Sequence, residues 1–348
     1  MNIPLWAGFE CGHLGWCNQD LLQDTRHTPL TDMTAHYDRA KALGIRTARD
    51  GLPWRHEPSA RTAAVPDGVR VIWDLCHFDP PPHREAHAMR CASAMRGPAH
   101  VVAVNEPSLW PLLCRRPRRE AIAAGKRMMS AFGLMADARF YTCDPFHRLN
   151  EEVFAATDAL VATGWISVVG VNYYPHDATV PLVDVLRAVS ARYGLPIAIM
   201  ETSWHVGHPK ARRRFPFIGD SQTNWLAHVQ AEVVASGAPV EGICWYPFLD
   251  QPVWGKPGTR RRWPCGWHGQ VVDSRTFATV RDCAVGDHVV RASCCGCGRQ
   301  VSLDLKSLVQ TRYADVGLDK LPFRCTACEG RLVEITVEDA PAPRGRQI

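Results

Sequence analysis

Two glutamates in this chain stand where a pair of carboxylates could perform acid/base and nucleophilic chemistry. Glu106 lies in a Val-Asn-Glu-Pro segment and Glu201 in a Met-Glu-Thr segment, and each follows a run of aliphatic and β-branched residues. Such runs are typical of buried strands, so each glutamate is expected at a strand end. One carboxyl of such a pair can protonate a leaving oxygen while the other attacks an anomeric carbon, which is a double displacement at a glycosidic bond.

Short apolar runs supply the elements that would position these glutamates. They are rich in Val, Ile or aromatic residues, as expected for strands that are buried on both faces. The predicted strands are Ile3–Phe9, Gly44–Arg49, Val69–Leu75, His100–Val104, Ala138–Thr142, Val168–Tyr173, Pro196–Met200 and Gly242–Tyr246. Helices are predicted between most of them, at Asp32–Leu43, Arg118–Leu134, Leu182–Tyr193 and Thr223–Ala235.

This alternation predicts the α/β fold class and, within it, a (β/α)8 TIM barrel over residues 1–275. Eight strands alternating with helices over about 250 residues are typical of that barrel. A doubly wound open sheet is the alternative, but that fold calls for a glycine-rich phosphate loop after the first strand. The Gly-Phe-Glu-Cys-Gly segment at 8–12 lacks the pattern. In a barrel, catalytic groups are expected at the carboxyl ends of the strands.

Polar side chains follow the predicted strands closely. In chain order the series is Glu10, Arg49 with Asp50, His77 with Asp79, Asn105 with Glu106, Asp144, Asn172 with Tyr173, Glu201 and finally Trp245. Asp50, Asp79 and Asp144 could equally be helix N-caps, because Asp often accepts backbone N–H groups after such a loop. That interpretation fits poorly for two glutamates, an arginine and an Asn-Tyr pair together.

In this order the motifs resemble those of the clan of (β/α)8 retaining glycoside hydrolases that contains the family 1 β-glucosidases. The segments that carry the likeness are RDGLPW at 49–54, WDLCHFDP at 73–80, VNEP at 104–107, VNYYP at 171–175, Glu201, and Trp245 with Asp250 and Trp254. The WAGFEC segment at 6–11 is also similar to the start of bacterial family-1-like proteins.

The resemblance implies the catalytic roles. Glu106 would be the general acid/base, with its pKa raised by the second carboxylate. Glu201 would be the nucleophile, kept ionised by Arg49 and oriented by Tyr173. The two carboxyl groups would lie about 5–5.5 Å apart, as a retaining mechanism requires.

The resemblance also implies a carbohydrate substrate and the residues that hold it. Asn105 would hydrogen-bond the sugar 2-hydroxyl, His77 would bind another hydroxyl, and Trp245 would form an apolar floor beneath the ring. The complete set of substrate-binding residues is Glu10, Arg49, His77, Asn105, Asn172, Tyr173, Trp245 and Trp254.

Some positions depart from the family pattern. Glu10 stands where family 1 has a sugar-binding glutamine, and Val253 stands where it has a glutamate that grips the outer hydroxyls. Thr202 and Ser203 follow the nucleophile in place of Asn-Gly. The reaction type is therefore expected, with the sugar left open. A catalytically degenerate barrel that binds sugar or protein without turnover is the alternative.

Composition agrees with an enzyme of ordinary globular character. The 348 residues carry a net charge of +5, with 46% hydrophobic and 22% charged residues. The basic runs at 115–119 and 260–262 are typical of a solvated face, although the second could attract an anionic sugar. The sequence has no recognisable signal peptide and no apolar run of about 18 residues, so we expect a cytoplasmic protein with no membrane partner.

The cysteines fall into two groups. Most are scattered singly, and in the expected compartment they are predicted to be buried thiols, with disulfides as the alternative. Cys294 with Cys297 and Cys325 with Cys328 instead form paired C-x2-C motifs, which are typical of tetrahedral zinc sites. Cys295 is an alternative to Cys294 as a ligand.

These motifs predict a zinc-ribbon-like module at 291–338, after a linker at 276–290 and before a disordered tail at 339–348. A helical stretch is expected between the motifs, at Leu303–Tyr313. Zinc would supply much of the module's folding free energy, while catalysis by two carboxylates needs no cofactor. Basic and aromatic residues are few there, so nucleic-acid binding is not expected, and a structural or protein-contact role is favoured. A nucleic-acid-binding zinc protein would instead require a basic surface continuous with the module.

Overall fold

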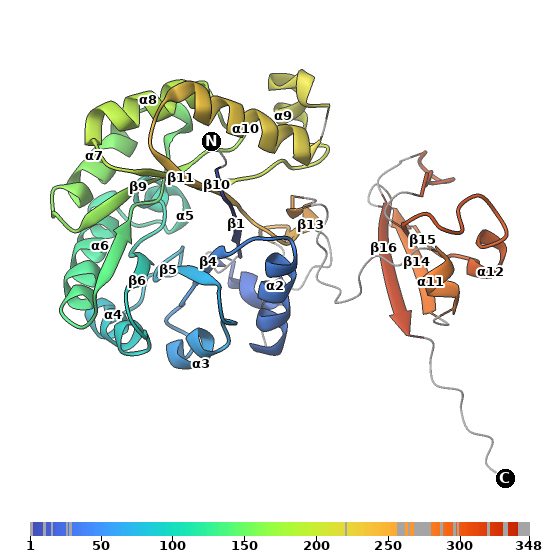
Figure 1. Cartoon of the computed structure of the whole chain (residues 1–348), viewed down its shortest axis with the longest axis horizontal. Helices are drawn as coiled ribbons and strands as arrows, with labels where there is room; N and C mark the ends of the chain where they lie inside the picture. The colour runs from blue at the N-terminus through green and yellow to red at the C-terminus, as the bar shows by residue number, and fades with distance from the viewer. Residues whose placement is uncertain are drawn as a thin grey trace, which may run out of the picture. The chain divides into compact units, whose positions relative to one another are not determined.

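The computed structural model describes residues 3–9, 12–14, 17–25, 27, 30–219, 221–255, 262–263, 265–267, 280–285, 288–294, 297, 299–318, 321–329 and 333–339. The chain divides into two compact units, Met1–Val272 and Asp273–Ile348, and each is described by itself (Figure 1). Within the described parts of the chain, no helix combines the length and the apolar character needed to cross a bilayer.

The first unit is a closed parallel barrel. Its strands are β1 (Leu5–Gly8), β4 (Thr47–Gly51), β5 (Arg70–Asp74), β6 (Ala99–Val102), β7 (Ala138–Tyr141), β9 (Ile166–Asn172), β10 (Ile197–Thr202) and β11 (Val240–Trp245). They pair in chain order, β11 pairs with β1, and β10 pairs with β9, so the ring closes; the two-residue β8 (Asp144–Pro145) adds to the edge of β9. The predicted (β/α)8 fold class is confirmed, and each predicted strand overlaps one barrel strand.

Helices cover the outside of the barrel (Figure 1). They are α2 (Leu30–Ala42), α3 (Pro58–Ala63), α4 (Arg84–Ser93), α6 (Arg118–Gly133), α7 (Glu151–Val161), α8 (Leu182–Tyr193) and α10 (Gln222–Ser236). Three of these helices, α3, α4 and α7, were not predicted from the sequence. The inner face of α4 is built from small side chains and a histidine, so its apolar periodicity is weak. The sequence did contain a signal for α7, namely an N-cap residue followed by two acidic residues. Asn150 caps the helix by accepting a hydrogen bond from the backbone N–H of Val153.

Side chains fill the inside of the barrel. The interior cluster is Trp6, Ile72, Val102, Tyr141, Cys143, Val168, Ala198, Met200, Cys244 and Tyr246. Gly242 makes room for one of them, because a Cβ there would lie 2.0 Å from the ring of Trp6. The opposite faces of the strands pack against the helices in the larger core. This burial on both faces explains why the strands are almost continuously apolar.

The second unit is built on a small antiparallel sheet. Its strands β14 (His288–Cys294), β15 (Gln300–Ser302) and β16 (Val333–Asp339) pair in the order β15-β14-β16. The helices α11 (Val280–Val285) and α12 (Leu305–Leu308) accompany the sheet. The predicted helical stretch at 303–313 is thus helical over only a few residues.

The predicted linker at 276–290 contains α11 and the beginning of β14. Val280 and Cys283 of α11 are fully buried and pack with Val290, Leu305 and Leu318. These residues therefore belong to the core of the second unit, where their apolar side chains find a hydrophobic environment. The predicted tail begins at Asp339, which lies in β16, and the rest of it lies outside the described residues.

Candidate active site

Arg49 lies at the centre of the polar groups at the carboxyl end of the barrel. It is fully buried on β4, and its Nη1 lies 2.5 Å from Oε1 of Glu201 on β10. Its Nη2 donates to Oδ2 of Asp74 at 2.7 Å and to Oδ1 of Asn105 at 2.8 Å. One guanidinium therefore ties three strand ends together and supplies the counter-charge for the Glu201 carboxylate.

Glu106 occupies a different environment. Its backbone is left-handed, with φ 42° and ψ 56°, and its N–H donates to the carbonyl of Cys143 at 2.7 Å. Asn172 donates from Nδ2 to Oε1 of Glu106 at 2.8 Å. Burial, and then the nearby Glu201 carboxylate, raise the pKa of Glu106 well above its ordinary 4.5. A buried carboxyl with a raised pKa that lies beside a second carboxyl group is suited to donating a proton.

A tyrosine binds Glu201, but it is not the predicted one. Tyr174 donates its hydroxyl to Oε2 of Glu201 at 2.9 Å. Tyr173 points away, donates to the carbonyl of Val180 at 2.8 Å and stacks on Trp225. The prediction that Tyr173 orients Glu201 is therefore wrong, because neighbouring side chains of a strand point to opposite faces. That alternation was the missed signal, since Asn172 and Tyr174 share a face.

His77 and Asn105 form a fixed pair. Asn105 uses Oδ1 to accept from Arg49, so its Nδ2 is the donor towards Nε2 of His77 at 3.2 Å. His77 must then carry its proton on Nδ1, which lies 2.8 Å from Oδ2 of Asp74. The arrangement sets the tautomer of His77 and leaves a second Asn105 N–H for a ligand hydroxyl.

The predicted floor residue Trp245 is fully buried, donates from Nε1 to the carbonyl of Cys265 at 2.9 Å and packs against Trp267. The next residue, Tyr246, takes the place beside the polar groups. Its ring lies 5.0 Å from the Arg49 guanidinium and stacks on His77 at 5.8 Å. Tyr246 is thus a site residue that sequence reasoning missed.

The other predicted substrate residues have different positions. Asn172 contacts Glu106 directly, as described above. Trp254 is half-buried and packs edge-on against Phe78, with ring centroids 5.9 Å apart. Glu10 lies outside the described residues.

Each of the three aspartates at strand ends is held by at least one side chain. Asp50 accepts from Tyr37 at 2.6 Å and from Arg61 at 3.1 Å, and its Oδ2 lies 2.7 Å from Nε2 of His27, within a buried network. Asp79 pairs with Arg55 at 2.7 Å. Asp144, fully buried behind Glu106, accepts from the hydroxyl and the backbone of Ser108 at 2.6 and 3.3 Å. Burial raises the pKa of Asp144 to about 7.

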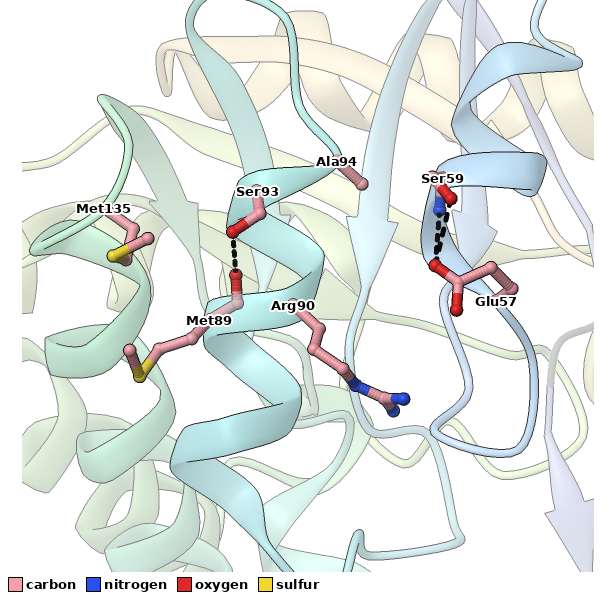
Figure 2. A pocket seen from close by; sticks show the side chains of 7 residues that line it. All are labelled: Glu57, Ser59, Met89, Arg90, Ser93, Ala94 and Met135. Carbon is pink, nitrogen blue, oxygen red and sulfur yellow. Dashed lines mark hydrogen bonds between the residues drawn. The ribbon is translucent and has the colours of Figure 1, made fainter.

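One hollow of about 330 Å³ lies on the outer helices, away from these groups (Figure 2). Its lining residues are Glu57, Ser59, Met89, Arg90, Ser93, Ala94 and Met135. Glu57 turns back to accept from Ser59 at 2.9 Å, and Ser93 donates to the carbonyl of Met89 (Figure 2). None of the strand-end residues described above lines it, so the hollow is separate from the candidate site.

The second unit brings four thiols together. The Sγ atoms of Cys294, Cys297, Cys325 and Cys328 all lie within 4.8 Å of one another. Among the described residues, no other set of His, Cys, Asp or Glu side chains comes this close in a group of three or more. Four thiolates suit tetrahedral zinc. The alternative ligand Cys295 lies outside the described residues, and the described cysteines elsewhere are free thiols.

Comparison with known proteins shows the fold. No protein-family model matches the chain, and no curated protein does. A solved hyperthermophilic β-glucosidase mutant aligns over 75% of this chain and 93% of its own, with 14% identity and a TM-score of 0.52. A family 1 β-glucosidase from Thermotoga maritima aligns over 76% and 91%, with 11% identity and a TM-score of 0.47. At such identities the first similarity shows a shared barrel architecture alone.

Proposed function

We propose that this barrel is a retaining glycoside hydrolase that cleaves a β-glycoside by double displacement, with Glu201 as nucleophile and Glu106 as acid/base. The observation that carries the proposal is the contrast between the two carboxyl groups. Glu201 is bound by Arg49 on one oxygen and by Tyr174 on the other. Glu106 instead accepts from the neutral amide of Asn172, and burial raises its pKa. One carboxyl has a cationic partner and the other has a raised pKa, so the pair suits the roles of nucleophile and acid/base.

In the first step, a carboxylate oxygen of Glu201 attacks the anomeric carbon. The glycosidic C–O bond breaks, and Glu106 gives its proton to the leaving oxygen. In the second step, the Glu106 carboxylate takes a proton from water, the water oxygen attacks the same carbon, and the ester bond to Glu201 breaks. The enzyme returns to its starting protonation state, and the sugar keeps its anomeric configuration.

The neighbouring residues support each step. Arg49 and Tyr174 hold both oxygens of Glu201, so the attacking lone pair has a fixed direction. Asn105 keeps an N–H for the sugar 2-hydroxyl, a contact that strengthens in the transition state. Asn172 binds Glu106 as a donor, which favours the carboxylate form in the second step.

The thiol cluster has a separate role in this proposal. The four cysteines would hold a structural zinc ion, which supplies folding free energy to a unit whose buried core is small. Catalysis by the two glutamates would use none of these thiolates. Contact with a protein partner through the second unit remains part of the proposal.

Trapping of the covalent intermediate tests the function. A panel of aryl β-glycosides would first identify the sugar that is turned over. The matching 2-deoxy-2-fluoro glycoside should then add one glycosyl group to the wild-type chain, located on Glu201 by peptide mass spectrometry. Glu201→Gln should be folded, inactive and unlabelled. Labelling of another residue would contradict the assignment, and binding without any turnover would favour the degenerate-barrel alternative.

A further inference from the structure

A second hollow, of about 380 Å³, lies among the outer helices of the first unit. Its lining comes from the segment between β9 and α8, from the end of α9 (Pro209–Arg214) and from α10. Tyr173 is part of this lining, and its hydroxyl donates to the carbonyl of Val180 and not to Glu201. The hollow is therefore separate from the candidate active site, and its volume is within the range of small-molecule sites.

Two opposite charges line this hollow without pairing with each other. Within the described parts of the chain, Arg214 has no side-chain hydrogen bond and no ion pair. Glu232 accepts from the backbone N–H of Val183 through Oε2 at 3.0 Å, and its Oε1 has no partner among the same residues. A guanidinium fork and one carboxylate oxygen are thus both available to a ligand.

A neutral imidazole and apolar side chains complete the lining. Burial lowers the pKa of His228, so its ring is neutral near pH 7. The centroid of this ring lies 5.6 Å from that of Phe215, which is half-buried. Ala178 and Val180 add aliphatic groups. The hollow therefore offers apolar contact as well as two charged groups, the combination that fixes a small ligand in one orientation.

The charges around the hollow disfavour ligands that carry a single charge. The sequence of α9 is PKARRR, with four basic residues and no acidic one, so a simple cation would be repelled there. Glu232 would in turn repel a simple anion inside the hollow. A ligand that carries both charges would meet an opposite charge at each end, since Arg214 belongs to α9 and Glu232 to α10.

We infer that this hollow binds a small zwitterion with an apolar group, of which a free α-amino acid with an aromatic side chain is the simplest case. The ligand's carboxylate pairs with the guanidinium of Arg214, and its ammonium group donates to Oε1 of Glu232. Its side chain packs against Phe215. This site is additional to the proposed catalysis and does not depend on it.

Calorimetry on the full-length chain tests the inference with probes that differ by one group each. L-Phenylalanine carries both charges and a ring. Of the other probes, 3-phenylpropionate lacks the ammonium group, 2-phenylethylamine lacks the carboxylate, and L-alanine lacks the ring. L-Phenylalanine should bind at one site, and each of the other probes should bind about tenfold more weakly or worse, because each leaves one part of the lining without a partner.

Two substitutions locate the charged contacts. Arg214→Gln should weaken the binding of L-phenylalanine about tenfold and should not weaken that of 2-phenylethylamine, which has no carboxylate to lose. Glu232→Gln retains an oxygen for the N–H of Val183, so the local structure is kept. It should weaken the binding of L-phenylalanine by a similar factor and should not weaken that of 3-phenylpropionate.

Arg213→Gln is the matched control, because Arg213 is the neighbouring cation on α9 and does not line the hollow. It should leave every affinity within twofold, and thermal melting followed by circular dichroism would show that each variant is folded. Equal affinities of wild type for L-phenylalanine and 3-phenylpropionate would identify a site for anions alone and overturn the inference. Equal losses in Arg214→Gln and Arg213→Gln, or no binding of any probe, would overturn it as well.

Discussion

Tyr174 binds Glu201 on the carboxylate oxygen that Arg49 does not occupy. The hydroxyl lies 2.9 Å from Oε2, whereas the guanidinium lies 2.5 Å from Oε1. Both oxygens of Glu201 are therefore held, and the residue is only 4% exposed. In the proposed mechanism, a nucleophile fixed in this way would require little reorganisation when it attacks.

Removal of the Tyr174 hydroxyl should slow the reaction. A hydrogen bond to a charged group contributes about 1.5–3 kcal/mol, so Tyr174→Phe should lower kcat/KM by about 10- to 100-fold. Tyr173→Phe is the matched control, since its hydroxyl donates to the carbonyl of Val180 and not to Glu201. It should keep kcat/KM within about twofold while lowering Tm slightly. Steady-state kinetics would decide, and equal losses in the two variants would argue against a role for Tyr174 at Glu201.

Glu106→Ala should be most damaging for substrates with poor leaving groups. General acid catalysis contributes about 10²–10⁴-fold, and a dinitrophenyl leaving group scarcely needs it. The variant should therefore lose far more activity on an alkyl glycoside than on a dinitrophenyl glycoside. Azide, which can replace water without a general base, should partly restore turnover and yield a glycosyl azide. Equal losses on both substrates would contradict the acid/base assignment.

Asp144 should make the barrel less stable as pH rises. Its folded pKa, about 7, is raised above the ordinary 3.8 by burial. The stability that its neutral form provides is fully present below about pH 4 and is lost as pH rises through about 7. Asp144→Asn keeps an oxygen for Ser108 and removes the charge, so its Tm relative to wild type should increase from pH 5 to pH 8. A Tm difference that does not change with pH would show that Asp144 stays neutral or is solvated.

Cys143 should control the protonation of Glu106 through Asn172. Its thiol donates to Oδ1 of Asn172 at 3.0 Å, and this leaves Nδ2 to donate to Glu106. In Cys143→Ala the amide loses that constraint. Because the Asn172 hydrogen bond lowers the pKa of Glu106, weakening it should raise that pKa further.

The alkaline limb of kcat/KM should therefore move to higher pH in Cys143→Ala, with a reduced kcat. Cys143→Ser retains a donor and should stay closer to wild type. Cys91→Ala, in a buried position on α4, is the control for loss of a thiol. If the pH profiles of Cys143→Ala and Cys91→Ala coincide, Cys143 has only a packing role.

Metal removal should destabilise the second unit and leave the first unit folded. The purified chain should hold about one zinc ion, because four thiolates bind this ion tightly. A chelator should unfold the second unit and leave glycosidase activity in the barrel nearly unchanged. Cys325→Ser should behave as the chelated protein does, whereas Cys17→Ser in the first unit should retain its zinc. Loss of activity in step with loss of metal would show that the catalytic unit depends on the zinc unit.

The sequence by itself determined the local elements and where they end. Strands that are buried on both faces leave long apolar runs, and a break in such a run marks the end that bears Glu106 or Glu201. The paired C-x2-C motifs likewise marked the four thiols, since each motif needs only one local turn to bring its two sulfurs together. The first unit was predictable because its signals are local and repeat along the chain.

Tertiary structure decided which side chains meet. In a strand that is buried on both faces, burial does not reveal which face points to the centre. Alternation groups Tyr174 with Asn172, but it does not say which face of the strand reaches Glu201. Barrel closure brings Tyr174 to Glu201 and Tyr246 to Arg49, because the strands that carry these residues are neighbours only in the closed ring.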